Sequence, residues 1–286
     1  MMRIWLVKNA FVNYAPFLKI YGALAQAAQA RGMELIEKDN ARLWDDLGKN
    51  EQQPDFVLFW DKDVRLAWQM ERAGMRLFNS AKSIALCDDK TLTCLALDGT
   101  LPMPEWRCAP STFYEYTDWE FLYRAGEKLH WPLIIKEAKG SFGLQVYLAQ
   151  NPEEAKEILS KNVGKPMLLQ RFVAPSFGRD VRIYVVGDRC AAAMERRGAQ
   201  GDFRANIGAG GTAHPHQITP EEEEIALKAV HTLGLTFAGV DLLFGQEGML
   251  LCEVNSNAHF TALQALTGVD IPGMILEEAA RQSQKE

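Results

Sequence analysis

Two apolar segments near the C-terminus carry acidic side chains, and this pairing limits the fold more than any other part of the sequence. Residues 240–244 and 249–254 predict a hairpin, with Asp241 on one strand and Glu253 and Asn255 on the other. Side chains two residues apart lie on one face of a strand. Burying two carboxylates together costs several kcal/mol unless a positive charge lies between them. This oxygen-only set suits Mg²⁺ or Mn²⁺. A polar hairpin end that faces water is the alternative.

The first 88 residues alternate short apolar strands with helices, which is typical of an open α/β sheet. Helices are predicted at 15–31 and 64–73, and strands at 4–7, 33–36, 56–60 and 76–78. A further helix is predicted at 83–97, after which Pro102 and Pro104 indicate an extended connector.

The remaining chain divides into two further parts, at 89–172 and 173–286. In residues 89–172 we predict strands at 132–136, 145–148 and 167–173, a turn at 140–143 and a helix at 152–159. In residues 173–286 we predict a hairpin at 181–195, a helix from Thr219 to near Gly234, and the carboxylate-bearing hairpin.

Charge and cysteine content exclude several classes of protein. The net charge of −6 disfavours binding of nucleic acid through a basic surface. The five cysteines are scattered, which disfavours a disulfide framework and a zinc site. No segment approaches the roughly 18 apolar residues of a membrane span. We therefore expect a cytoplasmic protein that binds neither nucleic acid nor a membrane.

Two further patterns point to anion binding. Lys136 ends an apolar strand just before the glycine turn at 140–143, and backbone amides of such turns approach phosphates closely. An exposed lysine on a hairpin is the alternative. Seven arginines and no lysine fall within residues 171–204, and arginine favours forked binding of carboxylate and phosphate. Ion pairing within the fold is the alternative for part of this set.

In combination, these segments resemble the ATP-grasp superfamily, and most closely its RimK-type glutamate ligases. The similarity follows the family order over about residues 80–270 and is carried by residues 89–91, 132–136, 140–143, 170–173, 178–182, 185–188, 193–197, 201–206, 210–211, 238–241 and 253–256. It implies an N-terminal open α/β domain, a small central lid and a C-terminal α+β domain, with ATP held between the last two. The expected boundaries are 1–88, 89–172 and 173–286.

The resemblance also implies the reaction and its residues. ATP would phosphorylate a carboxylate, and an amine would attack the acyl-phosphate to give an amide, ADP and phosphate. Lys90 and Lys136 would hold the ATP phosphates, and two Mg²⁺ or Mn²⁺ ions would be held by Asp241, Glu253 and Asn255. The adenine would meet the strand with Gln170, Arg171 and Phe172, and Asp180 would take the ribose or order that strand. Arg204, helped by Asn206, would stabilise the transferring phosphoryl group, with Arg182, Arg196 and Arg197 near the substrate.

Substrate identity stays open at this point. Arg171 stands where the family often has an acidic residue, and Asn257-Ala258-His259 replaces a common proline–glycine turn. We expect a ligase for glutamate or another amino acid, acting on a small carboxylate or on a protein or peptide C-terminus, and a homo-oligomer. A ligase for an amino-acid carrier protein or small cofactor, and a non-catalytic nucleotide-binding regulator, are the alternatives. The surplus of arginines predicts an additional substrate carboxylate, unless Arg182 and Arg197 pair with Glu195, Asp180 or Asp202.

Overall fold

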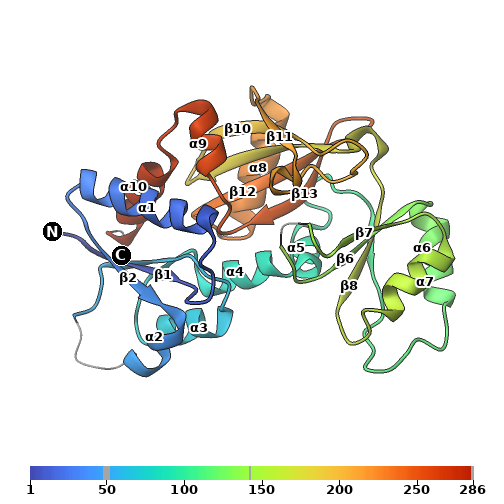
Figure 1. Ribbon diagram of the computed structural model, residues 1–286, viewed down its shortest axis with the longest axis horizontal. Coiled ribbons are helices and arrows are strands. Elements are labelled where there is room, and N and C mark those ends of the chain that lie inside the picture. The colour runs from blue at the N-terminus through green and yellow to red at the C-terminus, as the bar shows by residue number, and fades with distance from the viewer. Residues whose placement is uncertain (48–51, 142, 285–286) are drawn as a thin grey trace.

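The computed structural model describes residues 1–47, 52–141 and 143–284. Its three sheets occupy successive stretches of the chain, and Figure 1 shows the central sheet and its helices set apart from the other two. The three sheets lie in the parts predicted from the sequence, which we call the N-terminal part (1–88), the central part (89–172) and the C-terminal part (173–286). No helix among the described residues is both long and apolar enough to cross a membrane.

The N-terminal part is a parallel sheet with helices on both faces. Its strands run in the order β2-β1-β3-β4, and the bounds are β1 Arg3–Lys8, β2 Glu34–Asp39, β3 Phe56–Phe59 and β4 Leu77–Phe78. One face packs against α1 (Ala15–Ala30), and the other packs against α2 (Asn40–Asp46) and α3 (Val64–Arg72). Alternation along β1 explains this, since Ile4 and Leu6 face α1 whereas Trp5 and Val7 face α2 and α3.

Two short helices lead from this sheet to the central part, α4 (Ala81–Asp88) and α5 (Lys90–Leu97). The single helix predicted at 83–97 is therefore wrong. The side chain of Asp89 accepts hydrogen bonds from the backbone amides of Thr91 and Leu92, so Asp89 is the N-cap of a new helix. As a result, Lys90 lies at the first turn of α5.

The central part is an antiparallel sheet covered by its own helices on one face only; the other face, called the uncovered face below, is buried against α5 and β13 (Met249–Asn255) at Lys136 and Leu168. Its strand order is β5-β8-β6-β7, with β5 Trp106–Cys108, β6 Leu133–Glu137, β7 Val146–Ala149 and β8 Met167–Arg171. The helices α6 (Glu120–Leu129) and α7 (Pro152–Ser160) pack on Leu133, Ile135 and Leu169. Because strand side chains alternate, Lys136, Leu168 and Gln170 share the uncovered face.

The C-terminal part is an antiparallel sheet of order β11-β10-β9-β12-β13. Its strands are β9 Arg179–Val186, β10 Arg189–Arg197, β11 Thr212–Pro215, β12 Phe237–Phe244 and β13 Met249–Asn255. One face packs on α8 (Pro220–Thr232) through Val181, Ile183 and Val240. The opposite face is apolar at one end, through Tyr184 and Phe237, and charged at the other.

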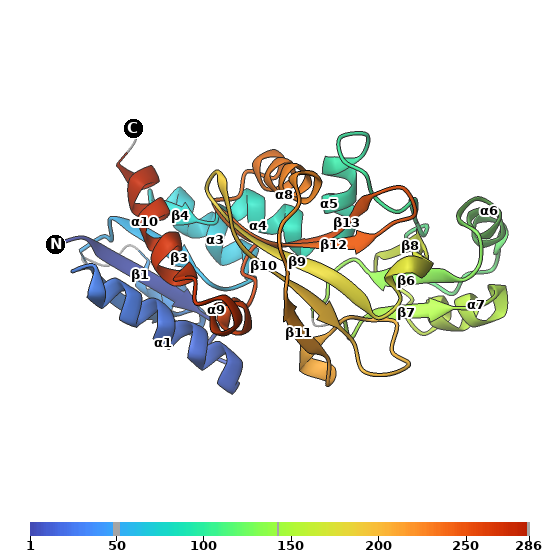
Figure 2. The same ribbon diagram turned by 90° about the horizontal axis from the view of Figure 1, so that it is seen from above.

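The N-terminal and C-terminal parts share a core. One buried cluster joins Ile4 and Ile20 of the first part to Tyr184, Phe237 and Ile275 of the last. The final helices are α9 (Thr261–Thr267) and α10 (Ile271–Ser283), and α10 lies beside α1 in both views (Figures 1 and 2). Helices α2, α6, α9 and α10 and strands β5 and β11 are additions to the elements predicted from the sequence.

Candidate functional site

A small pocket lies between the uncovered face of the central sheet and the C-terminal sheet. Its walls come from three places in the fold: β6 and β8 of the central part, β13 of the C-terminal part, and helix α5 with the connector that follows it. The lining residues are Lys90, Thr93, Cys94, Met103, Lys136, Leu168, Leu251, Cys252 and Glu253. The two lysines and Glu253 were all predicted site residues, and the fold brings them together.

Lys136 is the buried cation of this pocket. It is 6% exposed, and its Nζ lies 3.8 Å from the Cys252 sulfur. Burial alone lowers the pKa of the Lys136 ammonium, but Cys252 and Glu253 outweigh that effect, so the pKa is raised. Lys136 is therefore positively charged at neutral pH. A fully desolvated ammonium is well suited to hold an anionic ligand.

Cys252 reaches this pocket because of a β-bulge. Asp241 pairs with Glu253, but Leu242 pairs with Leu251, so Cys252 is the extra residue of β13. Strict alternation along β13 predicts Cys252 in the core, on the face opposite Glu253. The bulge breaks that alternation, so this expectation is wrong. Leu251 and Val254 still pack under α8, and Glu253 stays on the face of Asp241.

Three cationic side chains hold the glycine turn of the central part. Lys90 Nζ donates to the Gly140 carbonyl at 2.9 Å, and Arg204 Nη1 donates to the Gly143 carbonyl at 3.1 Å. Lys62, from the loop after β3, donates to Ser141 Oγ at 3.1 Å and pairs with Asp88 at 3.0 Å. Phe142, within this turn, lies outside the described residues.

Glycine is required at one end of this turn. Gly143 has a φ of +68°, which strains any residue with a Cβ atom. A Cβ there would also lie 3.4 Å from Arg204 Cδ and 3.9 Å from Asn206 Nδ2. The predicted phosphoryl-stabilising residues Arg204 and Asn206 therefore both lie against the turn. Asn206 also accepts a hydrogen bond from the Gly208 amide at 2.9 Å, within η2 (Ile207–Ala209).

The carboxylates lie on the opposite wall. Asp241 is directly across from Glu253 in the β12–β13 ladder, and Asn255 lies two residues beyond Glu253 on the same face. Glu253 lies 3.8 Å from Lys90 Nζ. Among the described residues no group of three or more His, Cys, Asp and Glu side chains has metal-binding geometry, but the predicted set consists of two carboxylates and an amide. Its oxygen donors fit Mg²⁺ or Mn²⁺ chemically.

Two arginines already contact Asp241, where the metal cation would bind. Both oxygens of Asp241 accept from Arg182, at 2.7 and 2.6 Å, and Arg196 lies 2.9 Å from the same carboxylate. Burial alone raises the pKa of Asp241, but Arg182 and Arg196 outweigh it, so the pKa is lowered. Asp241 is therefore ionised, with its charge already paired to two arginines.

The other predicted arginines are also paired with acids. Arg196 binds Asp180 in a forked geometry at 2.7 and 2.6 Å. Arg197 pairs with Glu195 at 2.9 Å and is 57% exposed, and Arg204 pairs with Asp202 at 3.0 Å. The surplus of cations that predicted an extra substrate carboxylate is therefore absent from the described residues. Ion pairing within the fold, the alternative considered above, describes Arg197.

The backbone of the predicted adenine strand is already hydrogen-bonded at Arg171. Gln170 is buried on β8, but the Arg171 amide donates to the Glu105 carbonyl at 2.8 Å. The Arg171 side chain pairs with Glu105 at 3.0 Å. Phe172 packs edge-on against Phe177, with 6.3 Å between ring centroids. An adenine contact through the Arg171 amide would therefore have to displace the carbonyl of Glu105, the residue just before β5. No backbone hydrogen bond of this kind involves the Phe172 amide in the described chain.

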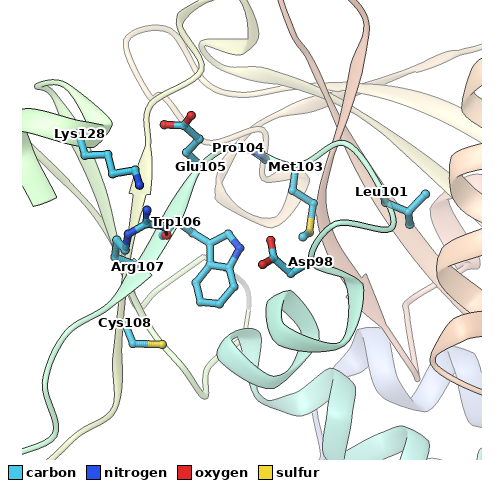
Figure 3. A pocket seen from close by; sticks show the side chains of 9 residues that line it. All are labelled: Asp98, Leu101, Met103, Pro104, Glu105, Trp106, Arg107, Cys108 and Lys128. Atoms are coloured by element: carbon cyan, nitrogen blue, oxygen red, sulfur yellow. Dashed lines mark hydrogen bonds between the residues drawn. The ribbon is translucent and has the colours of Figure 1, made fainter.

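A second, larger pocket lies on the connector between α5 and β5. It has a volume of about 380 Å³ and shares Met103 with the first pocket. Figure 3 shows the Trp106 ring at its centre, with acidic and basic side chains around the rim. The residues that line it are Asp98, Leu101, Met103, Pro104, Glu105, Trp106, Arg107, Cys108 and Lys128. Sequence reasoning predicts no function for it.

Lys62 is the cation at the glycine turn that sequence reasoning missed, in addition to Cys252 in the pocket. It follows directly after β3 and the buried Asp61, at the carboxyl edge of the parallel sheet. Ligand-binding residues of open α/β sheets concentrate at that edge. This position was the available signal, but only the folded chain shows that the edge faces the turn of the central part.

Comparisons with known proteins identify the family of the chain. A family model described as the RimK-like ATP-grasp domain matches residues 114–279. A probable alpha-L-glutamate ligase of Coxiella burnetii is 36% identical over 214 residues, which cover 73% of this chain and 68% of that protein. A protein of the same description from Citrobacter koseri is 40% identical over 157 residues, 54% of this chain and 52% of the relative. The chain spans about half the length of several of these curated relatives.

Solved structures show the same fold at low sequence identity. D-alanine–D-alanine ligase of Bacillus anthracis has a TM-score of 0.79 at 16% identity, over 100% of this chain and 99% of that one. A RimK domain ATP-grasp protein of Sphaerobacter thermophilus has a TM-score of 0.73 at 21% identity, over 96% and 98%. The predicted ATP-grasp fold is thus confirmed. With the family model covering more than half of its length, the chain belongs to the RimK-like ATP-grasp family.

Proposed function

We propose that this protein is an ATP-dependent carboxylate–amine ligase that joins glutamate or another amino acid to a carboxylate. The observation that carries the proposal is that Lys90 and Lys136 line one pocket together with Glu253, while Lys90 and Arg204 both donate to carbonyls of the glycine turn. This is a set of groups for neutralising and positioning phosphates. The names of the curated relatives support glutamate as the amine.

The chemistry explains why positioned charges suffice. A carboxylate is a poor electrophile because its leaving group would be oxide, and transfer of the γ-phosphoryl group converts that oxygen into a good leaving group. An amine can then attack, and phosphate leaves. Such a reaction depends on positioning and on electrostatic stabilisation of phosphoryl transfer. No protein nucleophile is required.

Each residue has a distinct task in this proposal. Lys90 and Lys136 bind the phosphates, and Arg204 with Asn206 stabilises the group in transfer. Asp241, Glu253 and Asn255 hold the Mg²⁺ or Mn²⁺ ions, which would neutralise phosphate charge. The strand with Gln170, Arg171 and Phe172 receives the adenine. Because the Arg171 amide is bonded to Glu105, we expect the Arg171 carbonyl and the Phe172 backbone to make that contact.

The family resemblance left two tasks for Asp180, binding the ribose or ordering the strand beside it, and its contacts favour an ordering role. Its carboxylate is buried and is held by both arms of the Arg196 guanidinium. A ribose hydroxyl would have to displace one of these charge-assisted bonds, which are about twice as strong as neutral hydrogen bonds. We therefore assign Asp180 to ordering the sheet beside the nucleotide.

The test measures products. Purified protein is incubated with ATP, Mg²⁺, glutamate and a panel of small carboxylates and peptides, and nucleotides are separated by chromatography. We expect ADP and phosphate, formed only when an acceptor is present. Stoichiometric AMP would reject the acyl-phosphate route. ATP binding without ADP formation on any acceptor would favour the nucleotide-binding regulator instead.

A further inference from the structure

Four buried charges form a row across the C-terminal sheet. In order they are Asp180, Arg196, Asp241 and Arg182, contributed by β9, β10 and β12. Their side chains are 7–14% exposed. Register creates the row, because Asp180 lies opposite Arg196 in one ladder and Arg182 lies opposite Asp241 in the next. The row is electrically neutral, with two arginines and two aspartates.

The two arginines of this row are held differently. Arg196 contacts two carboxylates, with a fork onto Asp180 and a contact of 2.9 Å to Asp241. In the described chain, every hydrogen bond and ion pair of Arg182 goes to Asp241. Removing Arg196 from the row would leave Asp180 buried without its counterion, which is costly. Removing Arg182 leaves no carboxylate unpaired, provided that another cation takes its place on Asp241.

A divalent cation at Asp241 has to compete with these guanidiniums. Both carboxylate oxygens already accept forked bonds from Arg182, and like charges held a few ångströms apart repel strongly in a partly desolvated site. Since Asp180 holds Arg196 in place, Arg182 is the guanidinium that a cation can displace from Asp241. Among the described residues no hydrogen bond or ion pair joins Arg182 to a second acid, although burial raises the pKa of the nearby Asp180 and the charge of Arg182 opposes that rise. Arg182 lies against Gly239, and with burial it lowers the pKa of His259 to about 4, so that side chain is neutral.

We propose that Arg182 is the exchangeable counterion of Asp241: a divalent cation displaces it, and the released guanidinium then binds an anionic substrate group. This inference rests on the proposed function, because the cation is the one that accompanies ATP. Arg182 is thereby a positioning residue for Asp241 before the cation binds and a substrate-binding residue afterwards. The exchange makes cation binding a condition for holding the carboxylate or acyl-phosphate.

The first test measures Mn²⁺ binding without turnover, by electron paramagnetic resonance of the unbound ion. Wild type, Arg182→Met and Arg124→Met are titrated with and without the β,γ-imido analogue of ATP. Arg124 pairs with Glu120 on α6, so its loss removes the same charge at an exposed position outside the site. We expect Arg182→Met to bind Mn²⁺ without nucleotide at least tenfold more tightly than wild type, and Arg124→Met to match wild type. Equal or weaker binding by a folded Arg182→Met protein would overturn the exchange.

The second test uses the wild-type protein, so it does not depend on the variant folding. Arginine Nε–H exchange with water is followed by nitrogen-15 NMR, because Arg182 and Arg196 both donate through Nε to buried carboxylates. We expect Mg²⁺ with the ATP analogue to speed exchange of one protected signal and to leave the other protected. If both signals stay protected at saturating Mg²⁺, the exchange of Arg182 is rejected, whereas the proposed function is not affected. A wild type that binds no Mn²⁺ even with the analogue would also reject the metal site of the proposed function.

Discussion

The N-terminal and C-terminal parts are joined by apolar packing, whereas the central part has a core of its own. Trp60 of the first part stacks on Phe237 of the last, with 5.5 Å between ring centroids and 12° between the ring planes. In contrast, the central core is built from its own residues, such as Leu122, Leu133 and Leu159. At the glycine turn the central sheet contacts the rest of the molecule through polar groups, from Lys62 and Arg204, whereas helix α5 packs into the C-terminal core through Leu97.

Because of this difference, the two walls of the site belong to two separately packed units of the fold, which we call bodies. The carboxylates Asp241 and Glu253 belong to the joined N- and C-terminal parts, and Lys136 and the glycine turn belong to the central part. Polar contacts exchange readily with water and ligands, while a shared apolar core does not. We therefore infer that the central sheet, with α6, α7 and the glycine turn, moves as a unit over a fixed wall of carboxylates. That arrangement suits a lid that closes on ATP and excludes water.

The largest expected effect concerns the fixed wall. Glu253→Gln removes one negative charge while keeping the shape of the side chain, so the sheet should fold as before. We expect turnover to fall by about 10²–10³-fold or more, because the phosphates lose the cation that this carboxylate holds. ADP formation by the folded variant is the measurement, with circular dichroism as the control for folding. Wild-type turnover would remove Glu253 from the site.

The next effect tests the joint between the N-terminal and C-terminal parts. The buried amide of Asn79 donates to the carbonyls of Phe237 and Ser256, at 2.9 and 2.7 Å, and its oxygen accepts from the Thr236 amide at 2.7 Å. Asn79→Ala would leave these buried backbone groups unsatisfied. We expect a loss of about 2–4 kcal/mol in the free energy of unfolding.

The central part offers the matched control for this variant. Asn162 has one side-chain bond to the Ile158 carbonyl, at 2.9 Å, and one from Lys165. Asn162→Ala should cost less than half as much as Asn79→Ala in urea unfolding. Equal losses from the two variants would contradict the view that Asn79 fastens two parts of the chain together.

A smaller effect is expected at the polar contact between the two bodies. Lys62→Met and Ser141→Ala each remove the bond between the loop after β3 and the glycine turn. One hydrogen bond of this kind is worth roughly 0.5–1.5 kcal/mol, so kcat/KM for ATP should fall about two- to tenfold. The double variant should be no worse than Lys62→Met alone, which also loses the ion pair with Asp88.

The control for this contact is Lys156, whose Nζ donates to Tyr123 Oη at 2.6 Å within the central part itself. Lys156→Met should leave kcat/KM for ATP unchanged. Fully additive losses in the Lys62 and Ser141 double variant would show that the two side chains do not act through their mutual bond.

The sequence predicts the elements that carry strong periodicity, and it places Lys90, Lys136 and Glu253 among the candidate residues that the fold brings to one pocket. Alternation along β9 and β12 places Val181 and Val240 under α8 and sets Asp241 on the other face, as observed. The bulge at Cys252 escapes prediction because an extra residue in a ladder is defined by the partner strand. The interruption between α4 and α5 at Asp89 was not predicted, because the apolar pattern continues through both helices.

Long-range contacts explain the remaining differences. Helix α10 docks on α1 through Arg31, which pairs with Asp270 and Glu277, both at 2.8 Å and almost 250 residues away. The local sequence of residues 271–283 does not indicate that contact. Likewise, the arginines of residues 171–204 read as surplus cations until the folded sheet shows their acidic partners on neighbouring strands. Residue type and spacing supplied the candidate residues, the family resemblance implied their roles, and strand register decided which charges are paired.

Hydrogen–deuterium exchange with ATP and Mg²⁺ tests the central claim most directly, because it reports on both bodies in one experiment. In the nucleotide-free protein, amides around the glycine turn, in residues 138–141 and 143–145, should exchange quickly. When ATP and Mg²⁺ bind, we predict that exchange there slows by about tenfold or more, while the core strands β9 and β12 stay unchanged because they are already protected. Unchanged exchange at the turn, in a sample shown to bind ATP, would contradict a central part that closes over the nucleotide.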